Sequence, residues 1–238
     1  MRTRLWLALV LLFGAGCAAP APLTEEPRGP WRVLILGDSI SIGYTPHVRK
    51  QLADSAMVVR PTNKNGGAEN CEGTNKGVQH IDRWLALEGG DWDVIHFNFG
   101  LHDLKRIDPE TGKGSNNPDD PYQASPERYE AQLREIVRSL QKTGAHLIFA
   151  TTTPVPTGVR PYRAPEDAVE YNRIAVGVME KAGIEVNDLY GLALPYLATL
   201  QQPENVHFTK DGSYALSLAV VQSVGRKRVV ASSQGSWR

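Results

Sequence analysis

The sequence predicts an α/β fold with three layers, in which helices cover both faces of a doubly wound, five-stranded parallel sheet. Short apolar runs of strand length alternate along the chain with longer helical stretches. Helical crossovers of this kind join parallel strands and are right-handed, so they place helices on both faces. The 238 residues, 41% of them hydrophobic, are enough for one such domain.

The first third of this domain contains two strands and two helices. Residues 31–36 form a buried strand, judging by their leucine and β-branched content. Residues 42–54 read as a helix, and residues 56–60 as a second strand, which a proline ends. A loop rich in glycine and asparagine, 63–74, leads to an amphipathic helix over 76–87.

The middle of the chain contains the third and fourth strands. Residues 93–99 form the third strand, and the long polar loop 108–126 follows it. Ser125 then caps a helix with Pro126 at its first position, and this helix runs to residue 142. The fourth strand covers 145–150.

The last third completes the sheet with a short strand over 184–186, after a helix at 165–182 that Gly183 ends. Further helices are expected near 189–200 and 210–224. The five strands give a flavodoxin-like sheet, and the domain spans 31–228, followed by a tail over 229–238. In such sheets ligands bind at the carboxyl ends of the strands.

The N-terminal segment has the layout of a secretory signal: Arg2 and Arg4 precede an apolar run, and small residues end it. Cys17 after Ala15 and Gly16 resembles a bacterial lipoprotein site, so residues 1–17 are interpreted as a lipoprotein-type signal with Cys17 lipidated. Cleavage nearby without lipidation is the alternative. Residues 18–30, rich in proline and alanine, form a flexible tether. The protein is thus expected to be exported. With a lipid anchor it would be a periplasmic or outer-membrane lipoprotein of the cell envelope; without one it would be secreted.

Charge and cysteine content limit the possible partners. Basic and acidic residues both number 26, so no broad positive field favours nucleic acid, and none is expected as a partner. Cys71 is the only cysteine outside the signal region, so no internal disulfide is expected, and its thiol is predicted to be buried.

Polar residues follow the first and third strands, and another polar group lies near the C-terminal end. Gly37-Asp38-Ser39 comes directly after the first strand, where a serine would be exposed at a helix N-terminus whose N–H groups can stabilise an oxyanion. The same residues could serve only as a helix cap. Near the C-terminal end, Glu204 and His207 stand three apart, so the carboxylate could orient the imidazole and leave its other nitrogen for the serine.

These residues resemble the SGNH hydrolases, also called GDSL-type lipases and esterases, over roughly residues 32–224. Gly37 to Ile40 match the first block; Gly100-Leu101-His102-Asp103 matches the Gly-x-Asn-Asp block with His102 in place of asparagine; the segment from Glu204 to His207 matches Asp-x-x-His with glutamate in place of aspartate. The resemblance implies the SGNH hydrolase fold, Ser39 as nucleophile, His207 as base and Glu204 as its partner. The oxyanion would be held by Ser39 N–H, a glycine N–H and His102.

The glycine could be Gly66, Gly67 or Gly73, all in the loop after the second strand, and Gly73 is chosen because it directly precedes the helix. Residues expected to line the substrate site are Asp38, Asn70, Gly100 and Asp103. No cofactor is expected. A metal site around His96, His102 and Asp103 is not favoured either, because no known ligand spacing supports it.

The implied activity is hydrolysis of carboxylic esters through an acyl-enzyme on Ser39. Short acyl or acetyl esters, on a small molecule or a carbohydrate, are favoured because no apolar lid is evident and the loop 108–122 is polar. The alternatives are a lipase or thioesterase for longer acyl chains, and a catalytically impaired domain that only binds glycan.

Overall fold

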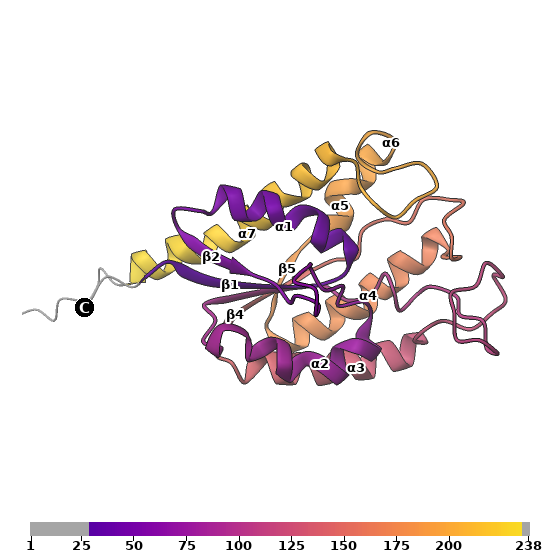
Figure 1. Ribbon diagram of the computed structural model, residues 1–238, viewed down its shortest axis with the longest axis horizontal. Helices are drawn as coiled ribbons and strands as arrows, with labels where there is room; N and C mark the ends of the chain where they lie inside the picture. Colours follow the sequence, from indigo (N-terminus) through magenta and orange to yellow (C-terminus); the bar gives the residue numbers. More distant parts are fainter. Residues whose placement is uncertain (1–28, 235–238) are drawn as a thin grey trace, which may run out of the picture.

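A five-stranded parallel sheet forms the centre of the molecule, with helices on both faces (Figure 1). The computed structural model describes residues 29–234. The strand order is β2-β1-β3-β4-β5, which is the flavodoxin order, and every neighbouring pair is parallel. The predicted fold class is therefore confirmed. The strands are β1 (Trp31–Leu36), β2 (Ala56–Val59), β3 (Val94–Phe97), β4 (His146–Ala150) and β5 (Glu185–Asn187).

The three central strands are buried on both faces, as their nearly continuous apolar runs require. Val33 to Leu36 of β1 have no exposed surface, and they pair in register with Val94 to Phe97 of β3. His96 is the polar exception, and burial lowers its pKa to about 4, so it packs here as a neutral side chain.

One helical layer consists of α1 (Ser39–Gln51) and α7 (Lys210–Gln234), and the other of α2 (Thr74–Leu85), α3 (Pro126–Gln141) and α4 (Pro165–Ala182) (Figure 1). Ser125 caps α3 by accepting from Arg128 N, and Gly183 ends α4 in a left-handed conformation, both as predicted. Four short helices complete the structure: η1 (Leu87–Gly89), α5 (Leu189–Ala193), η2 (Leu194–Tyr196) and α6 (Leu197–Leu200).

Several element bounds differ from the predicted ones. α1 begins at Ser39 and not at residue 42, because Asp38 caps it. The helix expected over 189–200 is broken into three short pieces, with Pro195 in the middle one. α7 continues past residue 228, where the domain was expected to end, since no glycine or proline interrupts it between Gly225 and Gly235.

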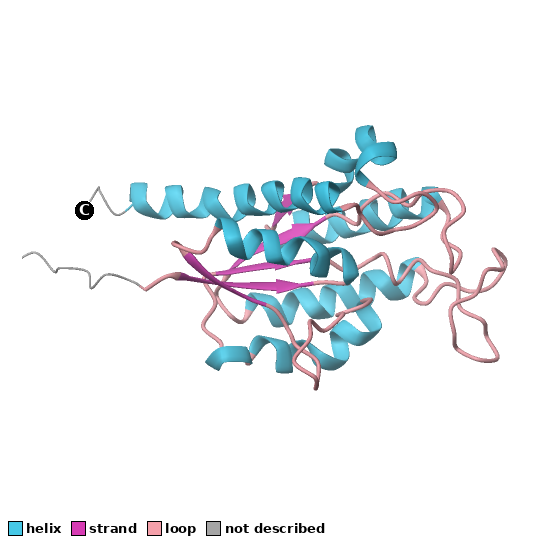
Figure 2. Ribbon diagram, turned by 45° about the horizontal axis from the view of Figure 1, so that its top comes forward, coloured by secondary structure: helices cyan, strands magenta, loops and turns pink. Residues whose placement is uncertain are grey.

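The loops that follow the strands all gather at one end of the molecule, at the tips of the strand arrows (Figure 2). The predicted site residues Ser39, His102 and His207 line one cavity. Within residues 29–234 no helix is long and apolar enough to span a membrane. The predicted signal segment with Cys17, most of the tether and residues 235–238 lie outside the described residues.

Candidate active site

Ser39 is the first residue of α1 and follows β1 after a two-residue turn. The Asp38 carboxylate caps the helix by accepting from Ile40 N at 2.9 Å. A Cβ at Gly37 would lie 3.0 Å from Ser41 Oγ, so the turn has little room for any other residue. The first N–H groups of a helix lack acceptors within the helix, so this turn can present both a hydroxyl and free donors to a ligand.

His207 is 168 residues from Ser39 in sequence, yet its Nε2 lies 2.9 Å from Ser39 Oγ. Gln201, which is almost fully buried, fixes the loop that carries it by donating to the carbonyls of Val206 and Pro154 at 2.9 and 3.0 Å. Gln202 N adds a bond to the His207 carbonyl at 2.9 Å. The Ser39–His207 separation is that of a hydrogen bond, as proton transfer from the hydroxyl to the imidazole requires.

The partner of the other imidazole nitrogen differs from the one expected. Asn205 Oδ1 lies 2.7 Å from His207 Nδ1 and also accepts from His207 N at 3.0 Å. Asn205 Nδ2 donates to Gln202 Oε1 at 3.3 Å, which orients the amide with its oxygen toward the imidazole.

Glu204, the expected partner, is exposed and forms no hydrogen bond or ion pair with any residue in 29–234. Its backbone is left-handed, with φ of 50°, and its side chain lies against Gly158. The assignment of Glu204 to orienting His207 was therefore wrong. The left-handed turn at Glu204 instead brings the side chain of Asn205 to the imidazole of His207.

The glycine assignment in the loop after β2 also requires correction. Gly73 is buried at the N-cap of α2, where a Cβ would lie 2.7 Å from Asp103 Oδ1, and it does not line the cavity that contains Ser39. Asn70, predicted to line the substrate site, does line that cavity. Its backbone N–H and its side-chain NH2 have no acceptor among the described residues, whereas its Oδ1 accepts from Glu72 N at 2.8 Å.

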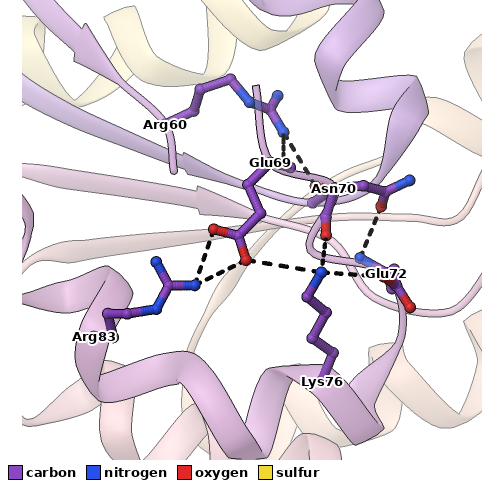
Figure 3. Close-up of polar contacts among 7 residues, drawn as sticks. Arg60, Glu69, Asn70, Glu72, Lys76 and Arg83 are labelled. Carbon is purple, nitrogen blue, oxygen red and sulfur yellow. Dashed lines mark hydrogen bonds and ion pairs between the residues drawn. The ribbon is translucent and has the colours of Figure 1, made fainter. Parts of the chain in front are cut away.

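A network of charged side chains holds Asn70 in place (Figure 3). Lys76 Nζ donates to the Asn70 carbonyl at 2.7 Å and pairs with Glu72 at 3.0 Å. Arg60 Nη2 donates to the Glu69 carbonyl at 2.9 Å, and Glu69 in turn pairs with Arg83 at 2.8 Å.

Arg60 and Cys71 link this loop to the turn before Ser39. Buried Arg60 also reaches Ser41 Oγ at 3.1 Å and the Gly37 carbonyl at 3.3 Å. Cys71 N donates to the same Gly37 carbonyl at 3.1 Å. The Cys71 thiol is fully buried, as predicted, and burial raises its pKa to about 11, so it is no nucleophile at neutral pH. These bonds connect the turn that carries Ser39 to the loop that carries Asn70.

His102 lines the same cavity as Ser39. Burial lowers its pKa to about 3, and the positive charges of Lys105 and Arg163 act in the same direction, so the imidazole is neutral under physiological conditions. Its Nδ1 is enclosed without a partner, which leaves Nε2 as the nitrogen that a ligand can reach. A neutral imidazole with its proton on Nε2 is a hydrogen-bond donor.

Three residues expected to line the substrate site, Asp38, Gly100 and Asp103, are instead buried and do not line the cavity. Asp103 accepts from the Thr74 hydroxyl at 2.6 Å and from Thr74 N at 2.8 Å, which fixes the start of α2. A Cβ at Gly100 would lie only 2.2 Å from Thr152 Oγ1. Asp38 and Asp103 therefore support the site by holding the starts of α1 and α2.

The cavity around Ser39 and His207 has a volume of about 460 Å³, within the range of small-molecule sites. Sequence reasoning missed three of its polar residues: Asn205, Arg160 and Arg163. The two arginines lie in the segment after β4, and the rule that ligands bind beyond strand ends would have selected that segment. The lining residues are Ser39, Asn70, Leu101, His102, Gly158, Arg160, Pro161, Arg163, Glu204, Asn205, Val206 and His207.

Among residues 29–234, no group of three or more His, Cys, Asp or Glu side chains is placed so that it could hold a metal ion. His96, considered in the sequence as a ligand, lies at the sheet with Nε2 3.2 Å from Asn187 Nδ2.

Comparison with known proteins identifies a family. The family model described as GDSL-like lipase/acylhydrolase matches residues 35–215. No curated protein is significantly similar to this chain in sequence.

Solved structures share the fold at low sequence identity. An acetyl xylan esterase, AlAXEase, is 15% identical with a TM-score of 0.62, and the match covers 81% of this chain and 99% of that one. A lipase/acylhydrolase from Enterococcus faecalis is 20% identical with a TM-score of 0.63, covering 82% and 96%. A mutant of an acetyl-xylooligosaccharide esterase from Geobacillus is 16% identical with a TM-score of 0.61, covering 82% and 94%.

Proposed function

Because the chain belongs to the GDSL-like lipase/acylhydrolase family and is thus a carboxylic ester hydrolase, we propose that it acts through Ser39 as nucleophile and His207 as general base. The resemblance to the SGNH hydrolases is confirmed by the same match. The observation that carries the proposal is the 2.9 Å separation between Ser39 Oγ and His207 Nε2 across 168 residues of sequence.

The reaction has two steps. His207 Nε2 takes the Ser39 proton as Oγ attacks the ester carbonyl, and the proton then passes to the alcohol as the carbon–oxygen bond breaks. Water next gives a proton to Nε2 and attacks the acyl carbon, which releases the carboxylic acid and restores the Ser39 hydroxyl. Asn205 accepts from Nδ1 throughout, which keeps Nε2 free of its own proton at the start.

Each tetrahedral intermediate has an oxyanion that needs donors. Three groups on the cavity support this role: the Ser39 N–H at the start of α1, the free N–H groups of Asn70, and Nε2–H of neutral His102. Asn70 thus takes the role that was predicted for Gly73. Arg60 bonds both the turn before Ser39 and the loop that carries Asn70, which supports the positions of the first two of these groups.

Hydrolysis of 4-nitrophenyl acetate tests the proposal. Ser39→Ala should lose nearly all activity, whereas the matched control Ser55→Ala, at the opposite end of β2, should keep it. Labelling with a fluorophosphonate, followed by peptide mapping, should modify Ser39 alone. Equal hydrolysis by Ser39→Ala and the wild type would refute the assignment, and binding of glycan without hydrolysis would favour the impaired domain.

We also propose that short acyl esters, in particular acetyl esters on carbohydrate, are the substrates. The cavity lining is mainly polar, and its apolar residues, Leu101, Pro161 and Val206, offer no long channel for an acyl chain. Two structures of similar fold bear the names of acetyl esterases of xylan or its oligosaccharides, which makes acetylated xylan a suitable first substrate. Faster turnover of octanoyl than of acetyl esters would refute this and indicate a lipase or thioesterase.

Export and lipid attachment at Cys17 are proposed from the signal-like sequence of residues 1–17. Expression in a bacterial host with labelled palmitate should label the wild type and not Cys17→Ser. Labelling of neither protein, with release into the medium, would favour simple cleavage and secretion.

A further inference from the structure

Arg163 is a charged side chain that the reaction described above does not use. It is only 6% exposed, yet it lines the cavity that holds Ser39 and His207. Its Nε donates to the Leu101 carbonyl at 2.8 Å and its Nη1 to the Pro161 carbonyl at 3.1 Å. Its Nη2 has no acceptor among residues 29–234 and is not an enclosed atom, and Arg163 lines both this cavity and the neighbouring one beside Asn116 and Thr157.

The charge of Arg163 also lacks a counter-ion, since it forms no ion pair within the described part of the chain. A guanidinium removed from water without a carboxylate partner is costly unless something else compensates it. Burial lowers its pKa to about 10, and the charge of buried Asp38 opposes that shift without contact. The group is therefore a largely desolvated cation at neutral pH, on the wall of the cavity that contains Ser39.

Arg160 adds a second positive charge to the same cavity. It is exposed and stands three residues before Arg163, in the same loop after β4. The one acidic residue that lines the cavity, Glu204, is exposed and pairs with neither arginine. A ligand with an anionic group would therefore meet two unpaired cations near Ser39.

A purely structural role would explain only part of this arrangement. The bond from Arg163 Nε to Leu101 ties the loop after β4 to the segment after β3, and the bond from Nη1 to Pro161 is local to the loop after β4. The remaining nitrogen, Nη2, makes no hydrogen bond with residues 29–234 and is left for a ligand. A planar guanidinium with free N–H groups suits a carboxylate, whose two oxygens can accept together.

We propose that Arg163, assisted by Arg160, forms an anion subsite, and that the preferred substrate is an ester that carries a carboxylate near the scissile bond, such as an acyl ester of an acidic sugar. The proposal rests on the proposed function, because it names the substrate class of that same cavity. It differs from the neutral acetylated sugars considered above in requiring a negative charge on the substrate.

Matched ester pairs test the charge requirement. On the alcohol side, 4-acetoxybenzoate is compared with 4-acetoxybenzamide; on the acyl side, 4-nitrophenyl hydrogen succinate is compared with its methyl ester. The subsite can lie on the alcohol side or on the acyl side of the ester, so at least one of the two pairs should respond. For that pair, the wild-type kcat/KM should be about tenfold or more higher for the anionic ester than for the neutral one, the effect expected of a charged hydrogen bond. Arg163→Gln should abolish the preference, Arg163→Lys should retain part of it, and the exposed control Arg173→Gln should keep it whole.

A binding experiment separates this proposal from the catalytic one. In the Ser39→Ala background, ligand-observed NMR should detect 4-acetoxybenzoate but not the benzamide, and Arg163→Gln should remove the signal. If Arg163→Gln does not fold, by its thermal melting curve, Arg160→Gln should still weaken the preference. Charge-selective binding without hydrolysis by the wild type would uphold the subsite and refute the esterase; hydrolysis of both members of each pair at equal rates would refute the subsite alone.

Discussion

Asn205→Ala removes the only hydrogen-bond partner that the described residues provide for His207 Nδ1. The bond is short, 2.7 Å, and the same oxygen holds His207 N at 3.0 Å. Without it the imidazole can rotate, and it can adopt the tautomer with its proton on Nε2, which cannot accept from Ser39. Both changes reduce the fraction of molecules that are ready to react.

The size of the effect follows from the charge that develops on the imidazole. His207 becomes a cation in the transition state, and a hydrogen bond to a charged group contributes about 1.5–3 kcal/mol. Since each 1.36 kcal/mol is a factor of ten in rate, kcat should fall by about 10- to 150-fold. Asn205→Asp should keep most of the activity, because its carboxylate can accept the same N–H with a charge-assisted bond.

Steady-state kinetics with 4-nitrophenyl acetate measure this prediction, with folding checked by thermal unfolding. Asn117→Ala, in an exposed loop where Asn117 bonds Asp120 at 3.0 Å, is the matched control. Glu204→Gln is the discriminating variant, and its loss should stay within about threefold, as expected for an exposed charge without a partner. A large loss in Glu204→Gln with near wild-type rates in Asn205→Ala would overturn the arrangement and restore Glu204 as the partner of His207.

Three further predictions concern groups around the site. His102→Ala should lower kcat by roughly 10²–10³, the cost of one oxyanion donor, and His102→Asn should recover most of it; equal rates in all three proteins would remove His102 from the oxyanion site. Burial raises the Asp103 pKa from 3.8 to about 7, so the folded protein holds this proton more tightly than the unfolded chain. The stabilisation that comes from protonated Asp103 is therefore complete below about pH 4 and is lost as the pH rises to about 7. Over that pH range, thermal unfolding should show the wild type losing stability relative to Asp103→Asn. Gly100→Ala should destabilise the fold by about 1–3 kcal/mol in denaturant titrations, because its φ is +151° and the added carbon would meet Thr152 Oγ1; an unchanged midpoint would contradict this.

The sheet and the two central site residues could be predicted from the sequence because each rests on a strong local pattern. Buried parallel strands are short apolar runs, and their carboxyl ends must meet at one edge. Ser39 follows β1 directly, so the sheet itself determines where it lies. His207 was found because it stands three residues after an acidic residue near the C-terminal end, in a segment that resembles the final block of the SGNH hydrolases.

The errors concern side chains whose direction depends on backbone torsions within loops. The choice between Glu204 and Asn205 depends on a left-handed φ at Glu204, and no spacing rule predicts that torsion for a glutamate. In the loop after β2, the chain turns so that Asn70 reaches the cavity while Gly73 packs against Asp103. Three glycines marked this loop as a turn but did not show which residue faces inward.

The sequence also did not show which charged side chains are buried. This is why the cavity has lining residues that belong to none of the sequence motifs. Arg160 and Arg163 are three residues apart and look alike in sequence, yet only Arg163 is buried, because its nitrogens reach carbonyls from two loops. Arg60 is buried for the same reason and joins the Ser39 turn to the Asn70 loop. Motif residues that are buried, such as Asp38 and Asp103, instead hold the starts of α1 and α2. Hence the motifs of this chain mark the scaffold and the Ser39–His207 pair, whereas the two arginines proposed to select a substrate lie outside the motifs, in the loop after β4.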